Sequence, residues 1–230
     1  MGGLSRPVST IASVLIVLAV GFTGCGRPRS GVETRDRGQD VIPEDIVAEA
    51  YLFDARVKKD DKPTSVRLEI YRTDTVIAFN GRGYLGKGAF RGIVRDDTLL
   101  VYFPTIDEFT HEPVADLLNS LSCRAGLKRF DLDALFEQTP DSVGLDNLVV
   151  DGDYEDEDHP VFVLRREGCE WALRLEYDRR DERWWLDEFY LESGPDFELR
   201  GRRRTLREQT EVPRSRFDVS IPAGAVRLIP

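Results

Sequence analysis

Residues 65–79, SVRLEIYRTDTVIAF, decide the fold of this chain. The apolar residues of the first half stand at every second position, and they are Val66, Leu68 and Ile70. Charged residues and a tyrosine stand between them, so an extended chain has one apolar face and one polar face. The polar residues 72–75 have turn chemistry and precede a second apolar run at 76–79. The pattern predicts a β-hairpin with one buried face.

The same period of two continues along most of the chain. It predicts further strands at residues 90–94, 98–103, 161–164, 171–177, 184–191, 197–206 and 226–229. Helical spacing occurs at residues 113–121 and 131–136, and Pro43 with its acidic neighbours predicts a short helix leading to Ala50. Strands and short turns without a βαβ rhythm predict a mainly β (α+β) domain. Its expected form is a curved antiparallel sheet, or incomplete β-barrel, with short helices covering the concave face.

The N-terminus has the features of a lipoprotein signal peptide. Arg6 precedes an apolar run at residues 11–20, which is shorter than the roughly 20 apolar residues of a membrane-spanning helix. Small residues then lead to Cys25, the expected site of acylation. We expect residues 1–24 to be the signal peptide, 25–42 the acylated N-terminus with a flexible tether, and 43–230 the folded domain. The alternative is an ordinary signal peptide with an incidental cysteine.

Composition excludes one broad class of function. The chain has 230 residues and a formal net charge of −10. General nucleic-acid binding draws its affinity from cationic contacts to phosphates, so an acidic chain is a poor candidate. No later apolar run is long enough to span a bilayer, so the expected partner is the membrane, reached through acylated Cys25. The pattern predicts no oligomeric state.

Two cysteines remain once Cys25 is acylated. Cys123 and Cys169 are expected to form a disulfide, because an oxidising envelope allows them to pair. Two buried free thiols are the alternative. A metal site is disfavoured, because neither histidine stands at ligand spacing from either cysteine.

Two motifs resemble ligand loops but fail on context. Residues 81–86 have the G-x-G-x-x-G spacing, yet no helix start follows to hold a phosphate, so they are interpreted as a flexible or bulged strand connection. Residues 151–158 are rich in carboxylates, but Asp156 stands where a calcium loop needs glycine, so a solvated turn is favoured. Metalloprotease and nucleophile-elbow motifs are missing as well. We expect no catalytic residue, no metal and no cofactor, and an enzyme is the lesser hypothesis.

Positive charge is concentrated at one place in this acidic chain. Arg200, Arg202 and Arg204 alternate along one face of the strand predicted at 197–206. One hypothesis is contact with anionic lipid headgroups near the anchor. The favoured alternative is an exposed strand face whose arginines pair with neighbouring carboxylates.

Large apolar side chains gather on the strands predicted at 171–177 and 184–191. Such residues usually belong to the core, but on the concave face of a curved sheet they also form pockets for acyl chains. The candidates for lining such a cavity are Trp171, Leu173, Trp184, Leu186 and Phe189.

Five segments together resemble a known family. They are YLFDARV at 51–57, SVRLEIYR at 65–72, DTVIAF at 74–79, RDDTLLVY at 95–102 and FDVSIPAGAV at 217–226. With the cysteine at position 25 they resemble a family of uncharacterised bacterial lipoproteins related to the lipoprotein-localisation factors LolA and LolB. The resemblance covers about residues 43–230 and implies an incomplete β-barrel with a helical lid and an apolar cavity for acyl chains. It transfers no individual site residue, and the protruding apolar loop of a LolB-type receptor has only residues 83–86 as a faint candidate.

The expected function follows from this resemblance. The chain is expected to be a non-enzymatic lipoprotein that binds an apolar ligand, either a lipid or lipoprotein acyl chains, in lipoprotein or lipid trafficking. Gly26 stands where an aspartate would favour retention at the inner membrane, so the outer membrane, facing the periplasm, is the expected location. The alternative is an envelope protein-interaction or structural module whose barrel is filled by its own side chains.

Overall fold

A computed structural model of the protein describes residues 45–59, 62–83, 86–116, 135–136, 149–153, 156, 158–165, 168, 170–180, 183–195 and 197–228. The expected signal peptide and the whole expected tether lie outside these ranges. So do Cys25, Cys123 and Cys169, and the predicted acylation and disulfide therefore fall outside the described residues.

The described residues form one sheet of twelve strands, in the order β12-β6-β5-β4-β3-β2-β1-β11-β10-β9-β8-β7. The strands are β1 (Asp45–Lys59), β2 (Lys62–Arg72), β3 (Val76–Arg82), β4 (Gly88–Arg95), β5 (Thr98–Phe103), β6 (Glu108–Pro113), β7 (Val149–Asp153), β8 (Val161–Arg165), β9 (Trp171–Arg180), β10 (Arg183–Ser193), β11 (Phe197–Pro213) and β12 (Val226–Arg227). Neighbouring strands are antiparallel, except for the parallel pair of β6 and β12. The predicted mainly β class is confirmed, and the sheet is mixed instead of purely antiparallel.

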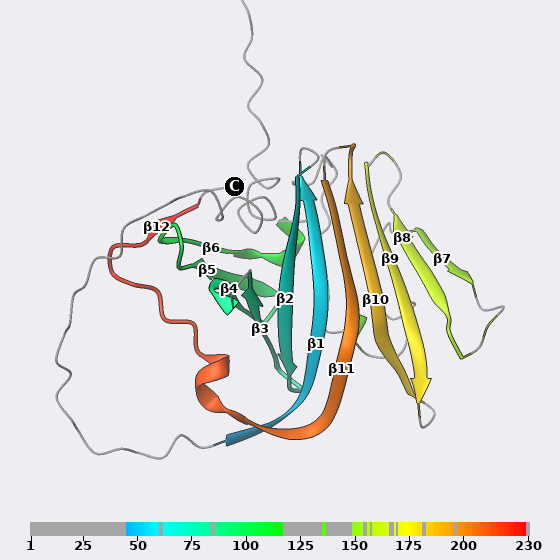
Figure 1. Ribbon diagram of the computed structural model, residues 1–230, viewed down its shortest axis with the longest axis horizontal. Coiled ribbons are helices and arrows are strands. Elements are labelled where there is room, and N and C mark those ends of the chain that lie inside the picture. The colour runs from blue at the N-terminus through cyan, green and yellow to red at the C-terminus, as the bar shows by residue number, and fades with distance from the viewer. Residues whose placement is uncertain are drawn as a thin grey trace, which may run out of the picture.

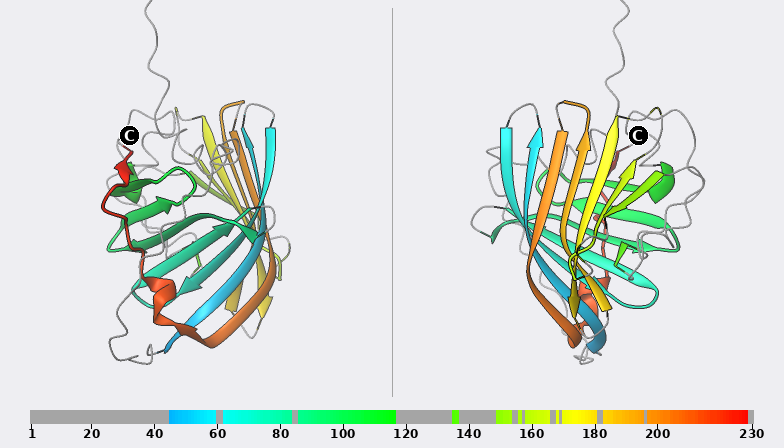
Figure 2. Two further views of the ribbon diagram at one scale, coloured as in Figure 1. Left: turned by 60° about the vertical axis from the view of Figure 1, so that its left-hand side comes forward. Right: turned by 90° about the vertical axis from the view of Figure 1, so that its right-hand side faces the viewer.

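The sheet is strongly curved and open. In Figure 1, β2, β1, β11, β10 and β9 run along the height of the molecule, whereas β4, β5 and β6 lie across them. The end strands β7 and β12 have no ladder between them in the described part of the chain, so the curved sheet does not close into a barrel. The C-terminal segment passes from the short 3-10 helix η4 (Arg214–Phe217) along the outside of the sheet to the free edge of β6 (Figure 2).

Side-chain burial follows the predicted period of two. In β2, Val66 and Ile70 are buried while Arg67 between them is exposed. The buried apolar side chains form two adjoining clusters, one around Tyr51, Phe53 and the strands β8 to β10, the other around β4, β5 and the far ends of β1 and β2. A third, small cluster lies under η4, where Phe217 packs near Tyr71. The main core therefore occupies the concave face, and η4 covers one end of the convex face.

The helix predicted to lead from Pro43 to Ala50 is wrong. Residues 45–50 belong to β1, which pairs with β2 on one side and with β11 on the other. The local helix-start signal is weak, whereas Ile46 and Val47 are β-branched and opposite β11 residues Val212 and Glu211 in the ladder. Two flanking ladders outweigh a weak local propensity.

The two predicted core-side helices are described only in fragments. Residues 114–116 are helical, and Val114 and Ala115 are buried. Leu135 and Phe136 are also buried. The rest of both predicted helices lies outside the described residues.

Besides β1, the alternation pattern misses two strands, β6 and β7. Strand β6 has the sequence EFTHEP, which contains one large apolar residue among polar ones. Its fully buried residue is Thr110. Strand β7 extends over the first three residues of the acidic stretch 151–158, where the sequence favours a solvated turn. Pairing with β5 and β8 makes these polar segments extended, and composition alone does not reveal it.

A buried arginine stabilises the bend of the long strands. The ladder of β11 with β1 is irregular between Leu52 and Phe53, and that of β10 with β9 is irregular around Asp187. Bulges of this kind bend strands and re-aim side chains. The side chain of Arg203 is 3% exposed and lies 2.9 Å from Asp178 and 3.0 Å from Asp187. It also donates a hydrogen bond to the Leu186 carbonyl at 3.1 Å.

Replacing this arginine should destabilise the bend. We expect Arg203→Ala to lower the free energy of unfolding by roughly 3 kcal/mol, because two partly buried carboxylates lose their common cation. Urea unfolding followed by tryptophan fluorescence measures the change. Arg207→Ala removes an exposed arginine of the same strand and should cost less than about 0.5 kcal/mol. Equal effects of the two substitutions would contradict a special role for Arg203.

Candidate functional site

The concave face contains a hollow of about 290 Å³. Every residue of the described ranges that lines it is apolar. Strands β1, β2, β3, β4, β9, β10 and β11 supply most of the wall, and Val114, Leu135 and Phe136 supply the rest. A wall without polar groups offers water no hydrogen bonds, so the hollow favours an apolar occupant.

Four of the five residues predicted to line a cavity are found at this wall, namely Trp171, Leu173, Leu186 and Phe189. Trp184 is not among the wall residues. Its ring is half-buried and lies 6.1 Å from that of Phe162, to the side of the hollow. The neighbouring Trp185 is 1% exposed and lies close to Tyr51 in the core. That a ligand occupies the wall remains a prediction.

Three phenyl rings of the wall lie over glycines of the adjacent strand. Phe79 is paired with Gly92, and Phe90 with Gly81, across β3 and β4. Phe189 is paired with Gly201 across β10 and β11. A Cβ atom added at Gly81, Gly92 or Gly201 would lie 2.1, 2.1 or 2.2 Å from a carbon of the facing ring. Only glycine therefore allows these rings to lie on the sheet.

The flat rings leave space above the sheet. Phe79, Phe90 and Phe189 all belong to the wall of the hollow, so the glycine surfaces below them set its depth. Phe79 and Phe90 also pack against each other, with ring centroids 6.0 Å apart. Glycine paired with a cross-strand aromatic ring is an established way to stabilise a curved sheet.

The sequence does contain a signal for this arrangement. The tripeptides FNG at 79–81 and FRG at 90–92 repeat the spacing F-x-G on two consecutive strands. In an antiparallel pair, that spacing lets each phenylalanine face the other strand's glycine. The interpretation of Gly81 as part of a bulged connection is confirmed, since the ladder is irregular between Gly81 and Arg82.

Leu135 and Phe136 cover the hollow from the side away from the sheet. The Tyr177 hydroxyl on β9 donates a hydrogen bond to the Leu135 carbonyl at 2.8 Å. The Phe136 ring packs edge-on against Tyr51, with centroids 5.3 Å apart. Burial raises the pKa of Tyr177 far above its usual range, so its hydroxyl stays protonated and remains a donor.

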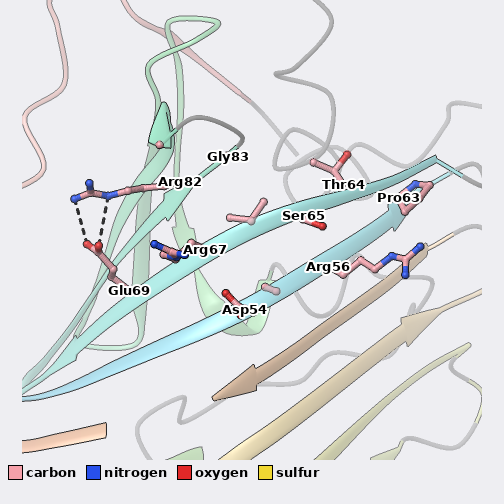
Figure 3. Close-up of a pocket in the computed structure, with 12 residues that line it drawn as sticks. Asp54, Arg56, Pro63, Thr64, Ser65, Arg67, Glu69, Arg82 and Gly83 are labelled. Atoms are coloured by element: carbon pink, nitrogen blue, oxygen red, sulfur yellow. Dashed lines mark hydrogen bonds and ion pairs between the residues drawn. The ribbon is translucent and has the colours of Figure 1, made fainter. Parts of the chain in front are cut away.

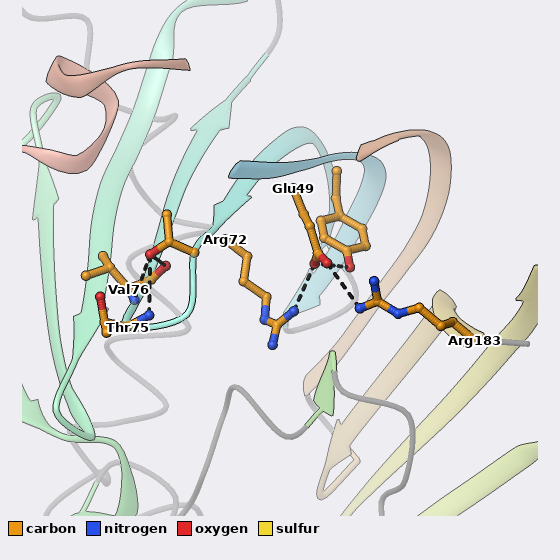
Figure 4. A network of polar contacts seen from close by, with 7 residues as sticks. Glu49, Arg72, Thr75, Val76 and Arg183 are labelled. Carbon is orange, nitrogen blue, oxygen red and sulfur yellow. Dashed lines mark hydrogen bonds and ion pairs between the residues drawn. The ribbon is translucent and has the colours of Figure 1, made fainter. Parts of the chain in front are cut away.

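A polar network lies next to the hollow at one end of the concave face. The Glu49 carboxylate lies between the guanidinium groups of Arg72 and Arg183, at 2.9 and 3.3 Å (Figure 4). The Tyr51 hydroxyl donates to the same carboxylate at 3.0 Å, and burial together with this charge raises the Tyr51 pKa. Arg183 lies 4.3 Å from the centroid of the Trp185 ring. The network joins β1 and β2 to β10, which is not their neighbour in the sheet.

The described part of the chain offers little for catalysis. It contains no group of three or more His, Cys, Asp or Glu side chains arranged to hold a metal ion. His111 is exposed and lies two residues before the C-terminal end of β6. The acidic stretch contains a local turn in which the Asp158 amide donates to the Asp156 side chain at 3.1 Å. Nothing here assembles a nucleophile with a base among the described residues.

The three arginines of β11 lie on the exposed, convex side. Arg200 forms an ion pair with Glu188, and Arg204 lies 3.4 Å from Asp54. Arg202 is exposed, between Asp54 of β1 and Glu188 of β10 in the ladders. Two of the three thus pair with carboxylates, although not with the neighbours in sequence that we expected.

Comparisons with known proteins assign no family. No family model matches the chain, and no curated protein matches it. Among solved structures, a DUF1329 family protein from Desulfovibrio piger is 10% identical, with a TM-score of 0.44, over 93% of this chain and 98% of that one. An uncharacterized conserved protein from Thermus thermophilus is 11% identical, with a TM-score of 0.39, over 76% of this chain and 88% of that one.

A third structure is titled "putative outer membrane lipoprotein-sorting protein domain" and comes from Vibrio parahaemolyticus. It is 8% identical, with a TM-score of 0.40, over 75% of this chain and 89% of that one. Likenesses this distant do not assign the chain to a family or a function. No helix within the described ranges is long and apolar enough to cross a membrane.

The glycines under the phenyl rings provide a direct test of what shapes the hollow. We expect Gly92→Ala to force the Phe79 ring off the sheet into the hollow and to cost about 1–3 kcal/mol of stability. Urea unfolding and a crystal structure of the variant measure both effects. Gly88→Ala is the matched control, since an added Cβ there meets nothing within 4 Å. The double variant Gly92→Ala/Phe79→Leu should recover part of the loss, and no recovery would contradict the proposed clash.

Proposed function

We propose that this protein is a lipid-anchored component of the bacterial envelope that binds one apolar chain in the hollow of its curved sheet. The observation that carries the proposal is the wall of the hollow, to which the described part of the chain contributes only apolar residues. An acyl chain of a lipid or of another lipoprotein is the ligand class that such a wall favours, since each buried methylene contributes about 0.8 kcal/mol. The role is non-enzymatic and belongs to lipid or lipoprotein trafficking.

The size of the hollow restricts the ligand. Its volume of about 290 Å³ lies near the lower limit of small-molecule pockets, roughly 300–1,000 Å³. It is about twice the size of an engineered apolar cavity, of about 150 Å³, that binds benzene. One slender chain segment therefore fits, whereas two chains side by side do not.

The cover of the hollow belongs to the same proposal. Val114 begins a helical stretch at the wall, and Leu135 is held there by Tyr177. We infer that Val114, Leu135 and Phe136 belong to a cover over the hollow. Exchange of a ligand then requires the contacts of Leu135 and Phe136 to open.

The anchor is the second part of the proposal. Cys25 follows a signal-like leader, and residues 25–42 are polar enough to act as a tether. Gly26 after the cysteine favours the outer membrane. Lipidation at Cys25 would hold the domain at the periplasmic face of that membrane.

Filling the hollow tests the ligand-binding part. We expect Ala55→Leu, at the wall, to weaken uptake of the fluorescent fatty acid cis-parinaric acid at least 10-fold while leaving stability unchanged or higher by about 0.5–2 kcal/mol. Fluorescence titration and urea unfolding measure the two quantities. Ala223→Leu, at an exposed position, should leave uptake unchanged. If the folded wild-type protein takes up no fatty acid, the ligand-binding proposal is wrong and an interaction module with a closed core is favoured.

Replacing the proposed lipidation site tests the anchor. We expect Cys25→Ser to move the protein from the carbonate-washed membrane fraction to the soluble fraction, because no thiol remains to be acylated. Immunoblotting of the two fractions measures the shift. Cys169→Ser keeps Cys25 and should remain with the membrane. A Cys25→Ser protein that stays firmly in the membrane fraction would contradict lipid anchoring.

A further inference from the structure

The convex face contains an open groove of about 890 Å³, on the opposite side of the sheet from the apolar hollow. Asp54 and Arg56 of β1, Arg67 of β2 and Arg82 of β3 line it (Figure 3). Glu69 lies beside Arg82, which it contacts at 3.4 Å. The hydroxyls of Thr64 and Ser65 belong to the same groove.

The strand register places arginines directly opposite one another. Arg67 is paired with Arg82 across β2 and β3, and Arg56 is paired with Arg200 across β1 and β11. In the neighbouring row, two residues before Arg56, Asp54 is paired with Arg67 on one side and with Arg202 on the other. Like charges directly opposite each other destabilise a sheet. Two such pairs in adjoining rows indicate that this face has a use for positive charge.

Local carboxylates leave part of that charge uncompensated. Arg82 is paired with Glu69, Arg200 with Glu188, and Arg204 with Asp54. Within the part of the chain that the structure describes, the side chains of Arg56, Arg67 and Arg202 form no hydrogen bond or ion pair. Their side chains are all exposed. An excess of positive charge thus gathers on one face of a chain whose formal net charge is −10.

We propose that this arginine groove, centred on Arg56 and Arg67, binds the phosphates of anionic phospholipid headgroups, so that the convex face rests on the membrane that holds the anchor. Guanidinium groups bind phosphate oxygens in a bidentate manner, and each arginine near an anionic surface adds attraction. The inference depends on the proposed membrane anchor but not on the apolar hollow.

The anchor can reach this orientation. Residues 25–44 extend to at most about 70 Å, at roughly 3.3–3.6 Å per residue. Arg56 is eleven residues along β1 from Asp45, about 36 Å at roughly 3.3 Å per residue. The tether is therefore long enough for the groove to meet the headgroups. Docking on this face would leave the apolar hollow directed away from the headgroups, where it can exchange ligand.

Neighbouring residues suit the same role. Tyr190 is half-buried and is paired with Arg200 on one side and Arg174 on the other. Tyrosine side chains are enriched at the headgroup level of membranes, where the ring is apolar and the hydroxyl is solvated. The site is thus wider than the predicted row of Arg200, Arg202 and Arg204, which forms one border of it.

Vesicle binding tests the proposal. The full chain with Cys25→Ser removes acyl anchoring, and it is mixed with vesicles of phosphatidylcholine alone or with 30% phosphatidylglycerol. We expect binding to the anionic vesicles only, and Arg56→Gln/Arg67→Gln in this background should weaken it roughly 10- to 30-fold. The matched control Arg95→Gln/Arg179→Gln removes two exposed arginines outside the groove and should weaken binding less than 3-fold.

The other outcomes are decisive as well. Equal losses for the two double variants, or equal binding to both kinds of vesicle, would overturn the proposal. If millimolar inorganic phosphate raises the melting temperature of the protein but the protein binds no vesicles, free phosphate is the ligand. That outcome would also overturn the proposal. Adding Leu173→Phe, at a wall position of the hollow that does not line the groove, should leave vesicle binding unchanged, so a failure of the ligand-binding proposal is distinguishable from a failure here.

Discussion

A sheet with one apolar face must shield that face from water, and in this protein the single sheet does so mainly by curling around it. In this protein the alternation of side chains sends nearly all large apolar residues to one face, so the curvature is a consequence of patterning. The bulges in β10 and β11 increase the bend, and Arg203 occupies the place where they meet. Charged groups that are buried in the described part of the sheet are paired, as with Arg203 and with Glu49 between its two arginines.

A curved sheet does not by itself contain a hollow, because large side chains normally fill it. Here three phenyl rings lie on cross-strand glycines instead of standing upright. The sheet keeps the stabilising area of the aromatic rings, and the space above them stays free. The same feature thus contributes to the stability of the fold and to the shape of the candidate site.

The two faces of the sheet have different physical characters. The concave face supplies an apolar wall, and the convex face presents arginines to solvent, several of them opposite one another. One strand serves both faces, since Ala55 lines the hollow while Arg56, the next residue, lies in the groove. A protein held by a lipid tether has a use for both properties at once, one toward an apolar ligand and one toward charged headgroups.

The sequence by itself determined the strand-rich class, most strand positions and, in strands such as β2 and β9, which residues are buried, because these depend on local alternation. It also pointed to four of the residues at the wall of the hollow. Only the tertiary structure decided that residues 45–50 form a strand and that β6 is extended despite its polar residues. It also decided that Arg56 and Arg67 lie near Arg202 on the convex face. It alone placed Phe79, Phe90 and Phe189 over glycines. These features depend on the register between strands, which pairs residues far apart in the chain and leaves almost no trace in local composition.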